Sequence, residues 1–168
     1  MRTRKNGFPW MLAAAIMLSG SETALANPPG YSFARIAVLG DSTPGGGTFV
    51  NDFEPSSIQN NGDIAFVADV STGGEGVFLV RNGHISQLAR SGNPAPGGGM
   101  FMFSAGGELG RVGFNQSGDA VFGFTLDPLS FPLGLNSGIY RFSRNNQVLS
   151  ALVIPNATPA PGGGTPGS

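Results

Sequence analysis

The chain has 168 residues, of which 28 are glycine and 13 are proline, whereas cysteine is absent and histidine occurs once. This length fits one or two small domains, and the absence of cysteine excludes a disulfide scaffold and any cysteine-based zinc or redox site. Nine basic and ten acidic residues give a formal charge of −1. Glycine and proline at this level indicate disorder when they are scattered, and turns between strands when they recur at regular spacing.

Residues 1–26 have the three parts of a cleavable export signal. Basic residues occur within the first five positions, an apolar stretch covers 9–18, and Ala24-Leu25-Ala26 supplies the small residues that signal peptidase requires. The apolar stretch is much shorter than the roughly 20 residues that span a bilayer. We therefore expect an exported protein, periplasmic, cell-surface or extracellular, that keeps no integral membrane segment once the signal is cleaved.

Removal of that signal changes the charge balance of the chain. The remaining sequence has six arginines, no lysine and nine acidic residues, which give a formal charge of −3. Proteins that bind nucleic acid need a basic patch to neutralise phosphates. We therefore expect no nucleic-acid partner and no attraction to an anionic membrane surface, and the sequence names no other partner.

Two patterns recur along the remaining chain. Pro-Gly-Gly-Gly begins at positions 44, 96 and 161, and each copy follows a short apolar stretch. A second pattern, at 59–66, returns at 115–122. Recurrence of this kind indicates repeated structural units, so the glycines and prolines are expected to form turns and not to mark disorder.

Apolar residues alternate with other residues within each unit. The alternation covers 63–70 in the first unit and 119–126 in the second. It predicts a strand with one well-buried face in each unit. In the first unit this face consists of Ile64, Phe66, Ala68 and Val70. Asn82-Gly83 predicts a type I′ hairpin turn. Each unit is therefore predicted to be a four-stranded antiparallel meander.

These landmarks predict the organisation of the chain. It comprises a signal peptide over 1–26, an N-terminal strand (36–40) and linker over 27–47, repeat 1 over 48–99, repeat 2 over 100–164, and the start of a truncated further repeat over 165–168. The expected fold is all-β, with about two β-propeller-type blades in an incomplete set; a β-sandwich is the alternative. Open sheet edges in such a set would favour self-association.

The recurring patterns also resemble those of a known group of proteins. The motif reads Asn115–Phe122 in one copy and 59–66 in the other, where Gln59 replaces the leading asparagine, and the linker reads Ala-Pro-Gly-Gly-Gly from Ala95. Over 36–168 the chain resembles exported bacterial tandem-repeat proteins named for an NxxGxxAF motif, the choice-of-anchor proteins, with APGGG linkers. The resemblance implies a propeller-like, exported protein to which no reaction is attributed.

A Gly-Asp-Ser sequence at 40–42 raises the alternative of an enzyme. It resembles the first block of GDSL-type esterases, in which Ser42 would be the nucleophile and would need a positioned base. His84 is the single histidine of the chain, and it lies in the predicted hairpin without the Asp-x-x-His setting of those enzymes. Because 40–44 also aligns with 92–96 as a linker, we expect a non-catalytic protein with no catalytic residues.

Acidic residues near the predicted turns raise the question of a metal site. Asp63 and Asp119 follow the turn glycines, and Asp41, Asp69 and Glu75 lie nearby. Calcium requires several oxygen ligands within one loop, and no Asp-x-Asp-x-Asp-Gly sequence is present. We therefore expect Asp63 and Asp119 to accept backbone N–H groups in turns, and we predict no metal-binding residues.

Two further features bear on ligands. The glycine triplets lack the Gly-Lys-Ser/Thr sequence of a phosphate-binding loop, so no cofactor-binding residues are predicted. Phe101, Met102 and Phe103 lie beside a predicted loop, where exposed apolar side chains would form a contact surface. The sequence therefore predicts an exported structural or binding module, with the esterase as the alternative.

Overall fold

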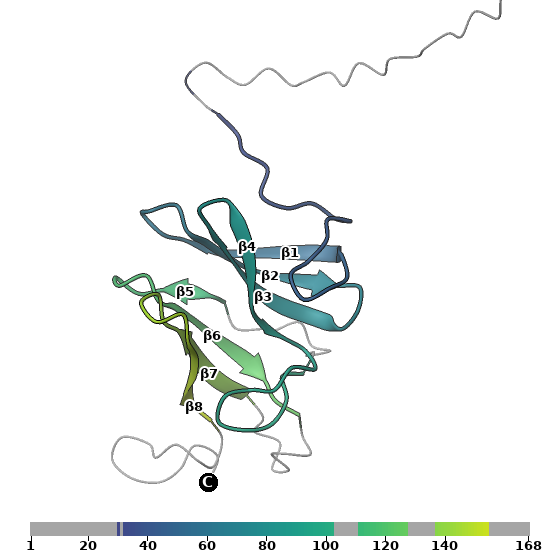
Figure 1. Cartoon of the computed structure of the whole chain (residues 1–168), viewed down its shortest axis with the longest axis vertical. Coiled ribbons are helices and arrows are strands. Elements are labelled where there is room, and N and C mark those ends of the chain that lie inside the picture. The colour runs from purple at the N-terminus through teal and green to yellow at the C-terminus, as the bar shows by residue number, and fades with distance from the viewer. Residues whose placement is uncertain (1–29, 31, 103–110, 128–136, 155–168) are drawn as a thin grey trace, which may run out of the picture. The chain divides into compact units, whose positions relative to one another are not determined.

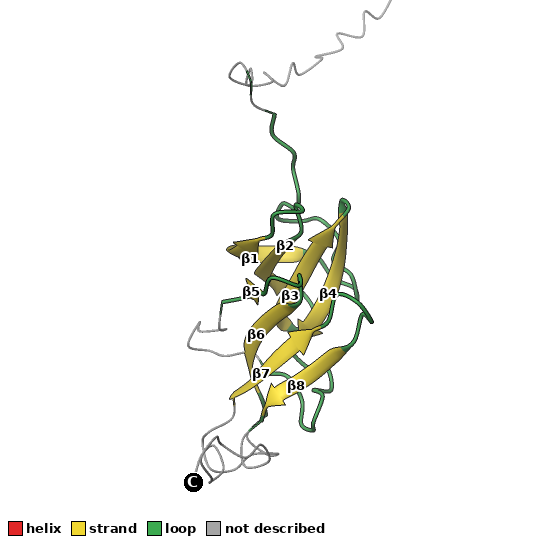
Figure 2. Cartoon of the chain, turned by 90° about the vertical axis from the view of Figure 1, so that its left-hand side faces the viewer, coloured by secondary structure: helices red, strands yellow, loops and turns green. Residues whose placement is uncertain are grey.

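A computed structural model of the chain describes residues 30, 32–102, 111–127 and 137–154. The chain divides into two compact units, 1–34 and 35–168, and the fold described below is that of the second. The predicted signal peptide and the predicted further repeat lie outside the described residues. The described part consists of strands and loops, without a helix (Figure 2).

The strands form two four-stranded antiparallel sheets, with orders β1-β2-β3-β4 and β5-β6-β7-β8 (Figure 1). The first sheet contains β1 (Phe49–Ile58), β2 (Ile64–Val70), β3 (Gly74–Arg81) and β4 (His84–Arg90). The second contains β5 (Gly113–Phe114), β6 (Ala120–Thr125), β7 (Ser137–Phe142) and β8 (Leu149–Val153). The all-β fold with two blade-like meanders is therefore confirmed, and strands do not cross between sheets as in a Greek-key sandwich.

The turn between β3 and β4 is the one that the sequence predicts. Asn82 and Gly83 have φ angles of 52° and 77°, and a type I′ turn requires positive φ at both central residues. Arg81 and His84 are the register partners on either side. The two-residue turn thus sets the pairing of this hairpin.

The predicted strand at 36–40 is wrong. These residues belong to no strand, and the first sheet begins at Phe49. Within the segment, Val38 N–H donates to Asp41 Oδ2 at 3.1 Å, and at its end Gly40 N–H donates to the Phe49 carbonyl at 2.8 Å. An apolar stretch becomes a strand when a neighbouring strand pairs with its backbone, whereas here Ile36 and Ala37 place their side chains beside Phe66 of the first sheet.

The prediction that β2 has one buried face is also wrong, because both of its faces are buried. Ala65 and Val67 belong to one apolar cluster, whereas Phe66, Ala68 and Val70 belong to another on the opposite face. Successive side chains of a strand point to opposite faces. A strand with apolar residues at nearly every position is therefore suited to packing on both sides.

The first cluster, here called the junction cluster, is shared by the two sheets. Its buried members are Ala65, Val67, Val77, Leu79, Leu88, Ala89 and Ala95 from the first half, and Phe101, Val112, Ala120, Phe122, Phe124, Leu126 and Tyr140 from the second. The Phe101 ring lies 4.7 Å from that of Phe124 and 4.9 Å from that of Tyr140, measured between centroids. One continuous core therefore joins both sheets.

The second cluster, here called the outer cluster, lies on the other face of the first sheet. Its buried members are Phe49, Phe66, Ala68, Val70, Phe78 and Val80, with Ala37, Phe53, Ile64 and Ile85 packed around them. The rings of Phe49 and Phe78 meet edge to face at 5.0 Å between centroids. Aromatic packing of this kind adds stability beyond the area it buries.

Tyr140 is fully buried in the junction cluster, and its hydroxyl has no hydrogen-bond partner. Burial raises the pKa of the Tyr140 phenol to about 12, because the charged form would lose its hydration. A buried hydroxyl without a partner costs about 1–3 kcal/mol. Phe78 is the corresponding residue of the first sheet, because it pairs with Phe66 as Tyr140 pairs with Phe122.

Replacing Tyr140 with phenylalanine should change how stability depends on alkaline pH. Between the ordinary pKa of 10.0 and the folded value of about 12, the unfolded protein has lost the phenolic proton and the folded protein keeps it, so stability falls as pH rises. Tyr140→Phe removes this contribution and should leave stability at neutral pH unchanged or higher. Urea unfolding of both proteins at neutral and alkaline pH measures the effect, and parallel losses in both would contradict it.

Candidate functional site

The two described Pro-Gly-Gly-Gly loops, 44–47 and 96–99, have the same backbone structure. Thr43 N–H donates to the Gly47 carbonyl at 2.9 Å, as Ala95 N–H donates to the Gly99 carbonyl at 3.0 Å. The three glycines have φ angles of 86°, 97° and 83° in the first loop and 87°, 113° and 77° in the second. Three successive positive φ angles favour glycine, so the triplet serves to redirect the chain.

Polar side chains hold the first of these loops. The buried Arg90 donates from Nη1 to the Gly46 carbonyl at 2.8 Å and from Nη2 to Thr72 Oγ1. The side-chain oxygen of Gln87 lies 2.8 Å from the place that a Cβ of Gly45 would take. Arg90 thus anchors the loop to the end of β4, and Gln87 lies against Gly45.

In the second loop, apolar side chains lie at the positions that correspond to Gln87 and Arg90. A Cβ at Gly97 would lie 2.9 Å from Ile154 Cδ1 and 3.4 Å from Ala151 Cβ. Ala151 lies opposite Tyr140 in the second sheet, as Gln87 lies opposite Phe78 in the first. Because the loop keeps its shape with either set of neighbours, its geometry follows from the glycines and not from a bound ligand.

Ser42 lies in the first linker, where it forms an isolated bridge with Thr48. Pro94 forms the corresponding bridge with Met100 in the second linker, so this backbone arrangement does not need a hydroxyl. His84 is exposed at the start of β4. In the described part of the chain no hydrogen bond joins Ser42 and His84, so the structure supplies no nucleophile–base pair.

The expectation that the Asp63 carboxylate accepts a backbone N–H is wrong. Its Oδ2 accepts instead from Arg81 Nε at 2.8 Å, in an ion pair within the β2–β3 hairpin. The Asp63 backbone N–H donates to Asn61 Oδ1 at 3.1 Å. The arginine reaches the carboxylate because the antiparallel pairing places the end of β3 beside the start of β2.

The same expectation is confirmed for Asp119. Its carboxylate accepts the Arg144 backbone N–H at 2.9 Å and the Asn115 side-chain amide at 3.1 Å. These hydrogen bonds, with the charge of Arg141, lower the pKa of the Asp119 carboxyl against a smaller opposing effect of burial. Over the described ranges, no group of three or more histidine or acidic side chains is placed to hold a metal ion.

The predicted contact surface at 101–103 is wrong for Phe101. This ring is buried in the junction cluster, packed on the rings of Phe124 and Tyr140. Met102 is exposed, and Phe103 lies outside the described residues. Phe101 forms an isolated bridge with Leu126 where Phe49 pairs with Val70, so it lies beside the end of β6 and does not belong to an exposed loop.

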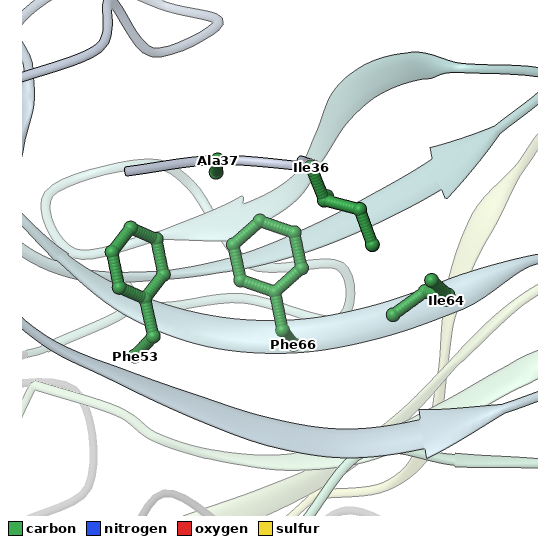
Figure 3. A pocket seen from close by; sticks show the side chains of 5 residues that line it. All are labelled: Ile36, Ala37, Phe53, Ile64 and Phe66. Atoms are coloured by element: carbon green, nitrogen blue, oxygen red, sulfur yellow. The ribbon is translucent and has the colours of Figure 1, made fainter. Parts of the chain in front are cut away.

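A pocket that the sequence interpretation missed lies on the outer face of the first sheet. It has a volume of about 340 Å³ and is lined by Ile36, Ala37, Phe53, Ile64 and Phe66. In Figure 3 the segment that carries Ile36 and Ala37 crosses above the two phenylalanine rings of the sheet. The nearly unbroken apolar run of β2 is the sequence signal that could have indicated a second buried face.

The lining of the pocket decides what it can do chemically. All five side chains are aliphatic or aromatic, and none can donate a proton, act as a nucleophile or ligate a metal. Such a surface binds by burial of apolar area. The pocket is therefore a candidate binding surface, and its chemistry is that of packing.

Comparison with known protein families matches residues 15–166 to a family described as a family of unknown function (DUF7453). The chain belongs to the DUF7453 family. No curated protein and no solved structure matches this DUF7453 chain. Within its described residues, the DUF7453 chain has no helix of the length and apolar character needed to cross a membrane.

The structural importance of the linker glycines can be tested by comparing two alanine substitutions in the DUF7453 chain. Gly97→Ala places a Cβ against Ile154 at a φ of 87°, whereas Gly113 in β5 has free space around its Cβ position and no positive φ. Positive φ costs an alanine about 1–2 kcal/mol. Gly97→Ala should therefore lower the free energy of unfolding by at least that amount, as measured by urea denaturation.

Gly113→Ala is the matched control and should leave the free energy of unfolding unchanged or raise it by up to about 1 kcal/mol. Equal stability losses in the two variants would show that the linker glycine has no special conformational role.

Proposed function

We propose that this protein is an exported, non-catalytic β-repeat protein that acts as a structural or binding module at the cell surface or outside the cell. The observation that carries the proposal is the lining of the pocket, which consists of five apolar side chains. A general acid or base must lie within hydrogen-bond reach of the reacting group. An apolar lining instead suits contact with another apolar surface.

Export rests on the sequence of the first 26 residues. A basic start, a short apolar stretch and Ala24-Leu25-Ala26 have the order of a signal peptide. The resemblance of the recurring motifs to NxxGxxAF repeats with APGGG linkers points to the same destination. The formal charge of −3 after residue 26 argues for a partner other than nucleic acid.

The sequence suggests that copies of the chain associate through open sheet edges. The edge strand β1 is poorly suited to such pairing. This edge strand of the first sheet contains Pro55 and two register irregularities in its pairing with β2. Proline and bulges are devices that disfavour pairing of an edge with another chain. We therefore look to a sheet face as the surface on which a partner binds.

Export and the absence of esterase activity can be tested on one preparation. The chain is expressed in a bacterial host and recovered outside the cytoplasm, where its first residue should be Asn27 if the signal is cleaved as the sequence indicates. The recovered protein should not hydrolyse a chromogenic short-chain ester above background. Ser42→Ala should behave in the same way, because Ser42 is proposed to be a linker residue.

Two results would contradict this proposal. Retention of the uncleaved chain in the cytoplasm would contradict export. Ester hydrolysis that is lost in Ser42→Ala, and kept in Ser117→Ala as a control for an exposed serine elsewhere, would favour the esterase alternative.

A further inference from the structure

We propose that the pocket on the outer face of the first sheet is the receiving half of a sheet-to-sheet junction, and that its occupant is the second sheet of another copy of this chain. This inference goes beyond the proposed function, because it names the partner and the two surfaces that meet. It depends neither on export nor on the absence of catalysis.

The junction cluster inside the chain is the template for this contact. The first sheet contributes the face that carries Ala65, Val77 and Leu88, and the second sheet contributes the face that carries Phe122 and Tyr140. We call these the donor face and the receiver face. All five side chains are buried where the two faces meet.

Strand pairing shows that the first sheet has a receiver face of its own. Phe66 pairs with Phe78 across β2 and β3, as Phe122 pairs with Tyr140 across β6 and β7. Directly paired residues of neighbouring strands lie on the same face of the sheet. The outer cluster, which contains Phe66 and Phe78, is therefore the counterpart of the surface that the second sheet presents to the junction.

The segment before the first linker occupies part of this receiver face. Gly40 and Gly92 donate to the carbonyls of Phe49 and Phe101, respectively, in the same way. Counting back from these glycines, Ile36 takes the place that Leu88 holds in the junction. Leu88 is 9% exposed, whereas Ile36 is 41% exposed, because no sheet surrounds it.

This receiver face is exposed at its edge, although Phe66 and Phe78 at its centre are buried. Ile58 pairs with Ile64 at the rim of the pocket, as Phe114 pairs with Ala120 in the second sheet. Phe114 packs against the junction cluster and Ala120 is buried, whereas Ile58 is 71% exposed. The pocket therefore marks where a donor face is missing.

In the part of the chain that the structure describes, the second sheet carries a donor face that has no sheet against it. Each sheet has a bulge in the pairing of its last two strands, at Leu88 between the pairs of β3 and β4 and at Leu152 between those of β7 and β8. Ile139 and Val77 are likewise counterparts, because each lies next to the bulge in its strand pair. Leu152 and Ile139 are 42% and 44% exposed, whereas Val77 is fully buried.

The donor face of the second sheet differs from its counterpart at two central positions. Gly123, which pairs with Ile139, stands where the first sheet has Val67, which pairs with Val77. Arg141 stands where the first sheet has Leu79, since each lies one residue beyond the ring that faces the receiver side. The apolar stem of an arginine can cover apolar surface while its guanidinium stays at the rim in water. The face thus keeps the apolar side chains of Ile139 and Leu152, has none at Gly123, and adds a charge at its border.

A second copy fits this surface better than a small apolar ligand because one molecule exposes both halves of a contact that it already makes internally. Donor and receiver are different surfaces, so the contact is head-to-tail. Such an interface produces a ring when its rotation closes and a filament when it does not.

Sedimentation velocity of the full chain over a range of concentrations tests the proposal. The wild-type chain should associate progressively as its concentration rises. Ile58→Glu disables the receiver face and Leu152→Glu disables the donor face, and each variant alone should remain monomeric. An equimolar mixture of the two should form dimers and nothing larger, because each variant keeps one working half.

Phe33→Glu is the control, since Phe33 is an exposed apolar side chain on neither sheet, and it should associate like the wild type. Circular dichroism verifies folding, and Ile139→Glu replaces Leu152→Glu should that variant unfold. A wild-type chain that stays monomeric at every concentration overturns the proposal. It is also overturned if the mixture associates no more than its components, or if an apolar dye fills the pocket of a protein that never associates.

Discussion

The burial of β2 on both faces is the constraint on which the rest of this structure depends. Successive side chains of a strand point to opposite faces, so Ala65 and Val67 enter the junction cluster while Phe66 and Ala68 enter the outer cluster. A one-residue slip in pairing would exchange small and large side chains between the two clusters. The register of β2 therefore fixes the packing of both faces at once, and it makes the first sheet a layer that needs a partner on each side.

The linkers and the pocket contribute differently to this structure, because the linkers redirect the chain and the pocket offers an apolar surface. Two Pro-Gly-Gly-Gly loops reproduce one backbone path, although the first lies against Gln87 and Arg90 and the second against Ala151 and Ile154. Their shape is thus set by glycine, and the Gly-Asp-Ser sequence at 40–42 is explained as part of a linker. The surface that lines the pocket is apolar, which suits the binding role proposed above.

Local features of the fold were predictable from the sequence, and features that depend on distant residues were not. Asn82-Gly83 determines its own turn, and alternation identified β2 and β6. By contrast, Phe101 is buried because Phe124 and Tyr140 pack on it, and nothing near position 101 shows those partners. The candidate site was missed for the same reason, since the pocket exists only where the segment at 36–37 crosses a face of the first sheet that the pattern alone did not show to be buried.

Because the junction cluster contains residues of both sheets, the two sheets should unfold as one cooperative unit. A substitution in the first sheet should then weaken the second, and amide hydrogen exchange measures this effect. Leu79→Ala removes a buried side chain that the first sheet contributes to this cluster, and core truncations of this kind cost about 2–5 kcal/mol. Amides of β6 and β7 should lose protection to the same extent as those of β2 and β3. Loss confined to the first sheet, with β6 and β7 unchanged, would show that the two sheets fold independently.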